Sequence, residues 1–189
     1  MKLFHIMGMI VLGVVELCAR EPQEFAQPIV FVCVEHLSSI EPEKANQAMT
    51  ISERMYARIG IKLRWKFPSA CPESGIRVDL TSHTPAHYNP GALAVAFPYE
   101  GTHIRLFTDR IGKARPKIQT VLMGHVLAHE IAHILEGVSR HSATGIMKAN
   151  FDDRDCNAMQ WFDMPFNQFD IDLIRTGIAY RTQALEARR

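Results

Sequence analysis

The sequence predicts one domain of mixed α/β (α+β) class, on two observations. The first half of the chain alternates short apolar, β-branched runs with one segment of helical spacing, and two long helical segments follow in the second half. The chain has 189 residues, of which 47% are hydrophobic, enough to build a single proper core. Residues 20–189 are therefore expected to form one domain. Residues 1–19 differ from this domain in composition.

The first half of the predicted domain supplies the strands. Residues 28–34 form a β-branched apolar run typical of a buried strand, and residues 41–59 carry apolar side chains at helical spacing. Residues 61–67 alternate in hydrophobicity, which predicts a half-buried strand. Turn signals at residues 89–91 and 100–101 separate the remaining predicted strands, which are residues 76–80, 91–97 and 103–107.

Two helices follow these strands. Residues 117–135 contain no proline and many good helix formers, with Pro116 suited to the first turn and Gly137 to the stop. Apolar positions at helical spacing predict a final helix over residues 167–186. Residues 148–165, which lie between the two helices, are expected to be irregular.

The most informative residues lie on the first of these two helices. His129 and His133 are four residues apart, so both imidazoles lie on one helical face and could ligate one Zn²⁺. Glu130 follows the first histidine and could take a proton from a metal-bound water. This His-Glu-x-x-His pattern predicts a catalytic zinc site, for which a solvated helix face is the plain alternative.

A third ligand is predicted at His141. Glycine ends a helix in the left-handed conformation at little cost, so Gly137 could turn the chain and return His141 to the metal. Three imidazoles leave the fourth position of a tetrahedral zinc open, as catalytic sites require. His125 lies about 12 Å along the helix axis from His133 and is expected to be a packed histidine instead.

Other acidic residues are weaker candidates for the metal. Glu136 lies about 10 Å further along the axis than His129, so it could bind only if the helix unwound. Asp152, Asp153 and Asp155 form an alternative ligand set, although a polar loop explains them more simply.

The residues after the helix resemble those of one peptidase family. His141 is followed by Ser142 and, shortly afterwards, by Gly145-Ile146-Met147. Metzincin zinc peptidases, and their matrixin branch in particular, follow HExxH with a third histidine and a methionine-bearing turn. This chain departs from the family spacing, because Gly137 follows His133 by four residues instead of three and His141 follows it by eight instead of six.

The resemblance implies several structural features. The metzincin fold has a twisted, mostly parallel sheet of about five strands, with an antiparallel edge strand that residues 91–97 would supply above the cleft. That edge could accept an extended peptide as a further strand, or it could be a plain edge. Met147 would form an apolar floor under the ligands. If residues 28–34 and 61–67 pair in parallel, a Cys33–Cys71 disulfide is expected, with Cys156 either free or in place of one partner.

The function implied by the resemblance is that of a monomeric, zinc-dependent endopeptidase acting on peptide or protein substrates. One Zn²⁺ would be held by His129, His133 and His141, and Glu130 would serve as general base. Two other classes share these residues. One is an exported zinc hydrolase with a non-peptide substrate, and the other is a catalytically inactive binding domain of the same fold.

Charge and the first residues bear on partners and location. The sequence has 21 basic and 20 acidic residues without a dense basic cluster, which argues against a nucleic-acid partner. Residues 1–19 combine a positive start, an apolar stretch and a small residue, as a signal peptide does. A secreted or periplasmic protein without a stable membrane span after cleavage is expected, and an uncleaved or lipid anchor is the alternative.

Overall fold

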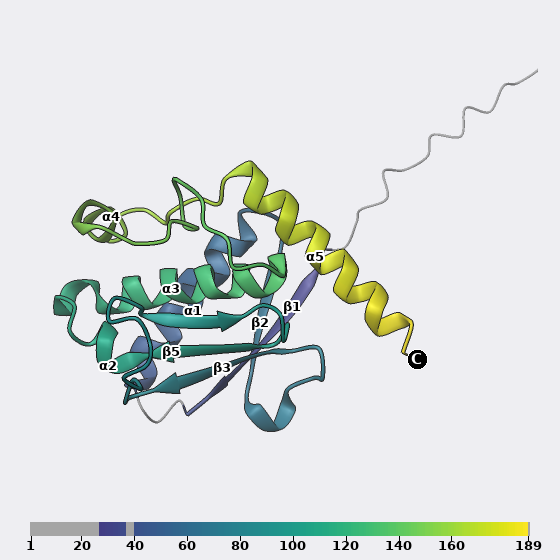
Figure 1. Cartoon of the computed structure of the whole chain (residues 1–189), viewed down its shortest axis with the longest axis horizontal. Coiled ribbons are helices and arrows are strands. Elements are labelled where there is room, and N and C mark those ends of the chain that lie inside the picture. Colours follow the sequence, from purple (N-terminus) through teal and green to yellow (C-terminus); the bar gives the residue numbers. More distant parts are fainter. Residues whose placement is uncertain (1–26, 37–39, 189) are drawn as a thin grey trace, which may run out of the picture.

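The computed structural model describes residues 27–36 and 40–188 (Figure 1). The predicted signal peptide, residues 1–19, lies outside the described residues. Within the described ranges, none of the helices has the combination of length and apolar character needed to cross a bilayer.

A five-stranded sheet forms one layer of the domain. Its spatial order is β2-β1-β3-β5-β4, and every neighbouring pair is parallel except β4 with β5. Strand β4 therefore forms an antiparallel edge, which confirms the predicted sheet. The strands are β1 (Ile29–Glu35), β2 (Lys62–Lys66), β3 (Ile76–Thr81), β4 (Ala94–Phe97) and β5 (His103–Phe107).

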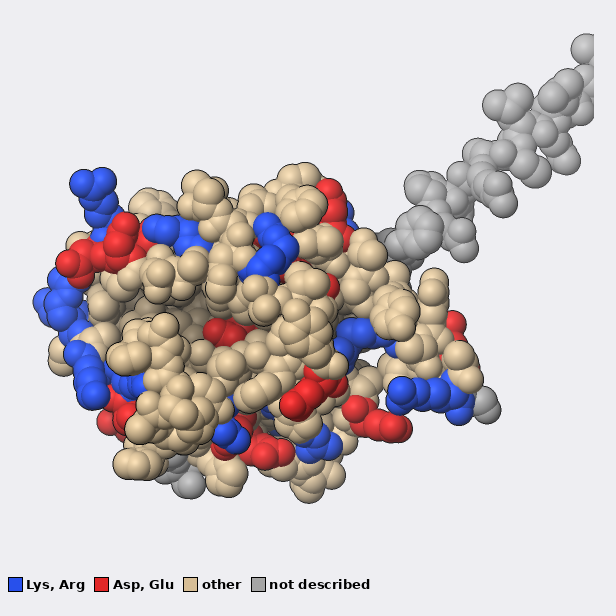
Figure 2. Space-filling view, in the orientation of Figure 1, with Lys and Arg blue, Asp and Glu red and all other residues tan. Residues whose placement is uncertain are grey.

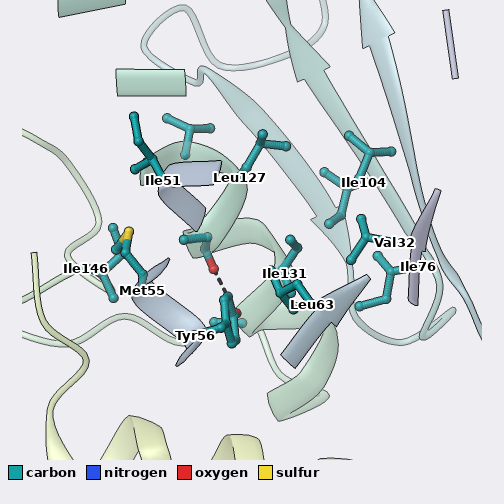
Figure 3. Packing of buried hydrophobic residues seen from close by; sticks show 14 of the residues in the cluster. Val32, Ile51, Met55, Tyr56, Leu63, Ile76, Ile104, Leu127, Ile131 and Ile146 are labelled. Carbon is teal, nitrogen blue, oxygen red and sulfur yellow. Dashed lines mark hydrogen bonds between the residues drawn. The ribbon is translucent and has the colours of Figure 1, made fainter. Parts of the chain in front are cut away.

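Three long helices complete the fold, namely α1 (Pro42–Ala57), α3 (Pro116–Glu136) and α5 (Gln168–Glu186). Helix α1 packs closely on α3, because a Cβ atom added at Gly124 would lie 2.7 Å from the Cβ of Ile51. The hydroxyl of Tyr56 also donates to the carbonyl oxygen of Ala128 at 3.0 Å (Figure 3). The core fills the space between these helices and the sheet, with Val32, Leu63, Ile76 and Ile104 from strands and Met55, Leu127 and Ile131 from helices.

Three short helices were not predicted from the sequence: η2 (Pro68–Ala70), α2 (Thr108–Ile111) and α4 (Asp153–Ala158). The prediction of an irregular segment over residues 148–165 is therefore wrong at α4. A local capping box explains this helix, since the Asp152 carboxylate accepts from the backbone N–H of Arg154 and Asp155. Six residues are too few to show a helical period in the sequence.

A disulfide between Cys33 and Cys71 joins β1 to the segment after η2, which confirms the pairing that the resemblance implied. Strands β1 and β2 pair in parallel, with Cys33 opposite Lys66, so β2 delivers the chain towards Cys71. Among the described cysteines, Cys156 is free.

Replacing Cys33 and Cys71 together with alanine should lower the free energy of unfolding by about 4 kcal/mol, because the bridge closes a loop with a sequence separation of 38 residues. Chemical denaturation of the oxidised wild type and the double variant measures the difference. Cys156→Ala is the matched control and should cost far less. Equal stability of the wild type with and without reductant would contradict the expectation.

Candidate metal centre

Helix α3 positions three of the predicted site residues. It begins at Pro116 and ends before Gly137, whose φ of 71° is left-handed and whose N–H donates to the His133 carbonyl oxygen at 3.0 Å. The predicted start and stop are thus confirmed. His129, Glu130 and His133 are only 7%, 8% and 5% exposed, respectively, so the helix presents them to the interior and not to solvent.

The turn after Gly137 brings His141 back to the helix. The potential ligand atoms of His129, His133 and His141 all lie within 4.8 Å of one another. The His141 ring centroid lies 5.3 Å from that of His129 and 5.0 Å from that of His133. His141 is exposed, whereas the other two are buried, so it forms the solvent side of the cluster.

The alternative acidic ligands are engaged elsewhere. Asp152 caps α4, and the Asp155 carboxylate accepts from the ammonium of Lys148. Glu136 forms an ion pair with Arg140 at 3.4 Å. Of the predicted candidates, the structure thus gathers the three histidines, whereas Asp152, Asp155 and Glu136 are in other contacts and Asp153 lies on the exposed first turn of α4.

Hydrogen bonds fix the tautomers of the two helical histidines. Nδ1 of His129 donates to the Ile146 carbonyl oxygen at 2.8 Å, and Nδ1 of His133 donates to that of Val138 at 3.1 Å. A carbonyl oxygen only accepts, so in each neutral ring Nδ1 carries the proton and Nε2 carries a lone pair. The two Nε2 atoms lie 3.0 Å apart.

Two lone pairs at this distance repel each other, and a cation bound to both nitrogens would offset that repulsion. Nitrogens bound to tetrahedral zinc at about 2.0–2.1 Å lie roughly 3.3 Å apart, close to the observed separation. Burial also lowers the pKa values of His129 and His133 well below their ordinary range, which keeps both rings in the neutral form that binds metal. The donor set therefore fits a zinc ion.

The Glu130 carboxyl lies close to the edge strand β4. Burial raises the pKa of its carboxyl to about 8, and a hydrogen bond from the backbone N–H of Ala96 on β4 acts in the opposite direction. A carboxyl whose pKa lies near neutral pH suits proton transfer in both directions.

A cavity of about 530 Å³ opens over the histidines. Residues 91–96 and residues 148–151 line it, together with the apolar side chains of Leu122 and Val126 on α3. Figure 2 shows a hollow on this face of the molecule, with acidic atoms at its floor. Met147 is fully buried, as expected of an apolar floor residue, and its carbonyl oxygen accepts from the Ser142 N–H at 2.7 Å.

Comparison with known proteins adds a likeness in fold. No protein-family model matches the chain, and no curated protein matches its sequence. Among solved structures, it is similar to archaemetzincin from Methanopyrus kandleri, with a TM-score of 0.50 and 14% identity over 84% of this chain and 99% of that chain. The chain has the archaemetzincin fold.

At this level of identity the likeness shows the fold alone. The archaemetzincin fold agrees with the five-stranded, mostly parallel sheet and its antiparallel edge strand. The metzincin resemblance is thereby confirmed in fold, and the narrower likeness to the matrixin branch stays a prediction.

Several site groups in this archaemetzincin fold were not predicted from the sequence. Three of them are backbone groups, namely the carbonyl oxygens of Val138 and Ile146 and the N–H of Ala96. The residue type does not show that a backbone group contacts the site. Arg140 and Asp170 were also missed, although a charged residue beside the third histidine and an aspartate in the first turn of α5 were visible signals.

His125 has the packing role predicted for it. It is fully buried, its Nδ1 donates to the Val121 carbonyl oxygen at 2.7 Å, and its Nε2 accepts from the Met164 N–H at 3.2 Å. The second bond requires a neutral ring. His125 therefore ties the segment before α5 to α3.

This arrangement predicts a pH effect on stability. Burial lowers the pKa of His125 below its ordinary value of 6.5, although the bond to Val121 and the charge of Asp163 oppose that shift. Below about pH 6.5 the unfolded chain binds the proton more readily than the folded chain does. The free energy of unfolding therefore decreases as the pH is lowered. His125→Gln should flatten the dependence of the unfolding free energy on pH by up to about 1.4 kcal/mol per pH unit. Urea unfolding from pH 7 to 5 tests this against the exposed-site control His83→Gln; parallel curves for all three proteins would refute it.

Proposed function

We propose that this protein is a zinc-dependent endopeptidase. The observation that carries the proposal is the pair of Nε2 lone pairs 3.0 Å apart, with His141 completing a group of three imidazoles. One Zn²⁺ would be held by His129, His133 and His141. When bound in such a site, zinc acts as a Lewis acid and lowers the pKa of water.

Glu130 would act as the general base. Its carboxyl is buried beside His129, lines the cavity and has a pKa raised to about 8. It would take the proton of the attacking water and pass it to the leaving amine. Ala96 of β4 lines the same cavity as Glu130, so the carboxyl lies close to the strand along which a peptide would bind.

A peptide is the substrate that the cavity favours. Strand β4 lies at the end of the sheet, and within the described residues no strand pairs with its outer edge. Residues 94–96 of that strand line the cavity, so an extended peptide could add to the edge and pass the histidines. Leu122, Val126 and Phe151 offer apolar contacts to one of its side chains.

Export is part of the same proposal. Residues 1–19 have the composition of a signal peptide, and the Cys33–Cys71 disulfide suits an oxidising compartment. We propose a monomeric protein that is secreted or periplasmic after the signal peptide is removed.

Digestion of a peptide library, with and without chelator, tests the function. We expect chelator-sensitive cleavage and about one zinc per chain, with zinc bound much more weakly by His141→Ala, which keeps two of the three ligands. Hydrolysis of esters or other amides without peptide cleavage would favour a non-peptide hydrolase. A folded wild type that takes up no zinc would refute the enzyme and leave a binding domain.

A further inference from the structure

The three histidines are not held in the same way. His129 and His133 each donate from Nδ1 to a carbonyl oxygen, whereas the ring of His141 makes no hydrogen bond within the described residues. Metal ligands of this kind usually gain their orientation from such a bond. Apart from the rings of His129 and His133 that lie beside it, His141 can be held in place through the residues on either side of it.

Both of those neighbours are bound to one buried carboxylate. The Arg140 guanidinium donates to Oδ1 of Asp170 at 2.8 Å, and the Ser142 hydroxyl donates to the same oxygen at 2.7 Å. Arg140 also donates to the Ser142 hydroxyl oxygen at 2.8 Å. These bonds close a ring of contacts around the backbone of His141.

The carboxylate that binds both neighbours is buried at the start of α5. Asp170 is fully buried in the first turn of α5, where its backbone N–H donates to the side chain of Asn167 at 2.9 Å. The Arg140 guanidinium lies 4.7 Å above the ring of Phe169 and also pairs with Glu136 at 3.4 Å. An arginine fork can reach two carboxylates and a hydroxyl at once, which an ammonium cannot do in the same geometry.

We infer that Arg140 is the positioning residue for the third metal ligand: it locks the loop between α3 and His141 onto Asp170. The loop is two residues longer than the metzincin spacing, and Arg140 lies within it. The inference rests on the proposed function, since it concerns the same metal. It assigns Arg140 no contact with substrate.

Zinc affinity of the full-length protein, measured by competition with a chromophoric chelator, is the first test. Arg140→Met should weaken zinc binding about 10- to 100-fold, as loss of a ligand's supporting group does. Arg140→Lys keeps the positive charge between the two carboxylates, so this variant should stay folded. It should weaken zinc binding less than Arg140→Met does. Visible spectra of the Co²⁺-loaded proteins should differ between wild type and Arg140→Met, because the ligand geometry changes.

A double-mutant cycle separates positioning from general damage. In a His141→Ala background, Arg140→Met should change zinc affinity less than about 3-fold, because its effect passes through His141. Arg77→Met is the matched control, since this arginine forms an ion pair with Glu35 on the sheet. The control should leave zinc affinity and the Co²⁺ spectrum unchanged.

Each outcome decides the inference. Equal zinc affinity of wild type and both Arg140 variants overturns it, and so does an undiminished effect of Arg140→Met in the His141→Ala background. A wild type that binds no zinc overturns both this inference and the proposed function. Zinc binding without peptide hydrolysis overturns the endopeptidase alone.

Discussion

Glu130→Gln should abolish peptide hydrolysis and leave zinc in place. Glutamine fills the same volume and can still accept the hydrogen bond from the Ala96 N–H, so the helix and the cavity are preserved. It cannot take a proton from water, and loss of a general base costs about 10²- to 10⁴-fold in rate. The measurement is kcat/KM on a cleaved peptide, alongside the zinc content of the same sample.

Glu73→Gln is the matched control, because Glu73 is exposed and its contact is a surface ion pair with Arg188. The control should retain the wild-type rate. Undiminished hydrolysis by Glu130→Gln would remove the general-base role. Loss of zinc together with activity would show instead that Glu130 helps to hold the metal.

Local signals explain how much of the fold and site was predictable. Pro116 and Gly137 bound α3 because proline and glycine restrict or free the backbone at their own positions, whatever the rest of the chain does. The spacing of His129 and His133 places both on one helical face for the same reason. Apolar runs and one alternating segment predicted the strands in order, because the burial of a strand shows in the hydrophobicity of its own few residues.

The unpredicted features depend on contacts between distant segments. Arg140 contacts Asp170, which is thirty residues away in the sequence, and Glu130 on α3 lies close to Ala96 on β4. The conformation of the loop that carries His141 could not be predicted from the loop sequence, because that conformation depends on contacts with α5. The sequence could name His141 as a ligand without showing what holds it.

Gly177→Ala should be the most damaging single methyl addition in α5. A Cβ atom at this position would lie 1.6 Å from the Leu135 carbonyl oxygen on α3, a distance that no side-chain rotation relieves. Alanine favours a helix by about 1 kcal/mol over glycine, but this gain is smaller than the cost of separating two packed helices. We expect the free energy of unfolding to fall by about 3 kcal/mol, measured by urea denaturation. Thr176→Ala, an exposed neighbour in α5, should change it by less than about 0.5 kcal/mol.

The same substitution should weaken zinc binding, because α5 carries Asp170 and the end of α3 carries His133. If the helices separate at Gly177, the carboxylate that holds Arg140 and Ser142 moves away from the helical ligands. Zinc should then stabilise Gly177→Ala less than it stabilises the wild type, as measured by the shift in Tm on adding zinc. Wild-type stability of this variant would mean that the two helices are further apart than the structure places them. A wild-type zinc shift in a destabilised variant would mean that the histidines hold their positions without α5.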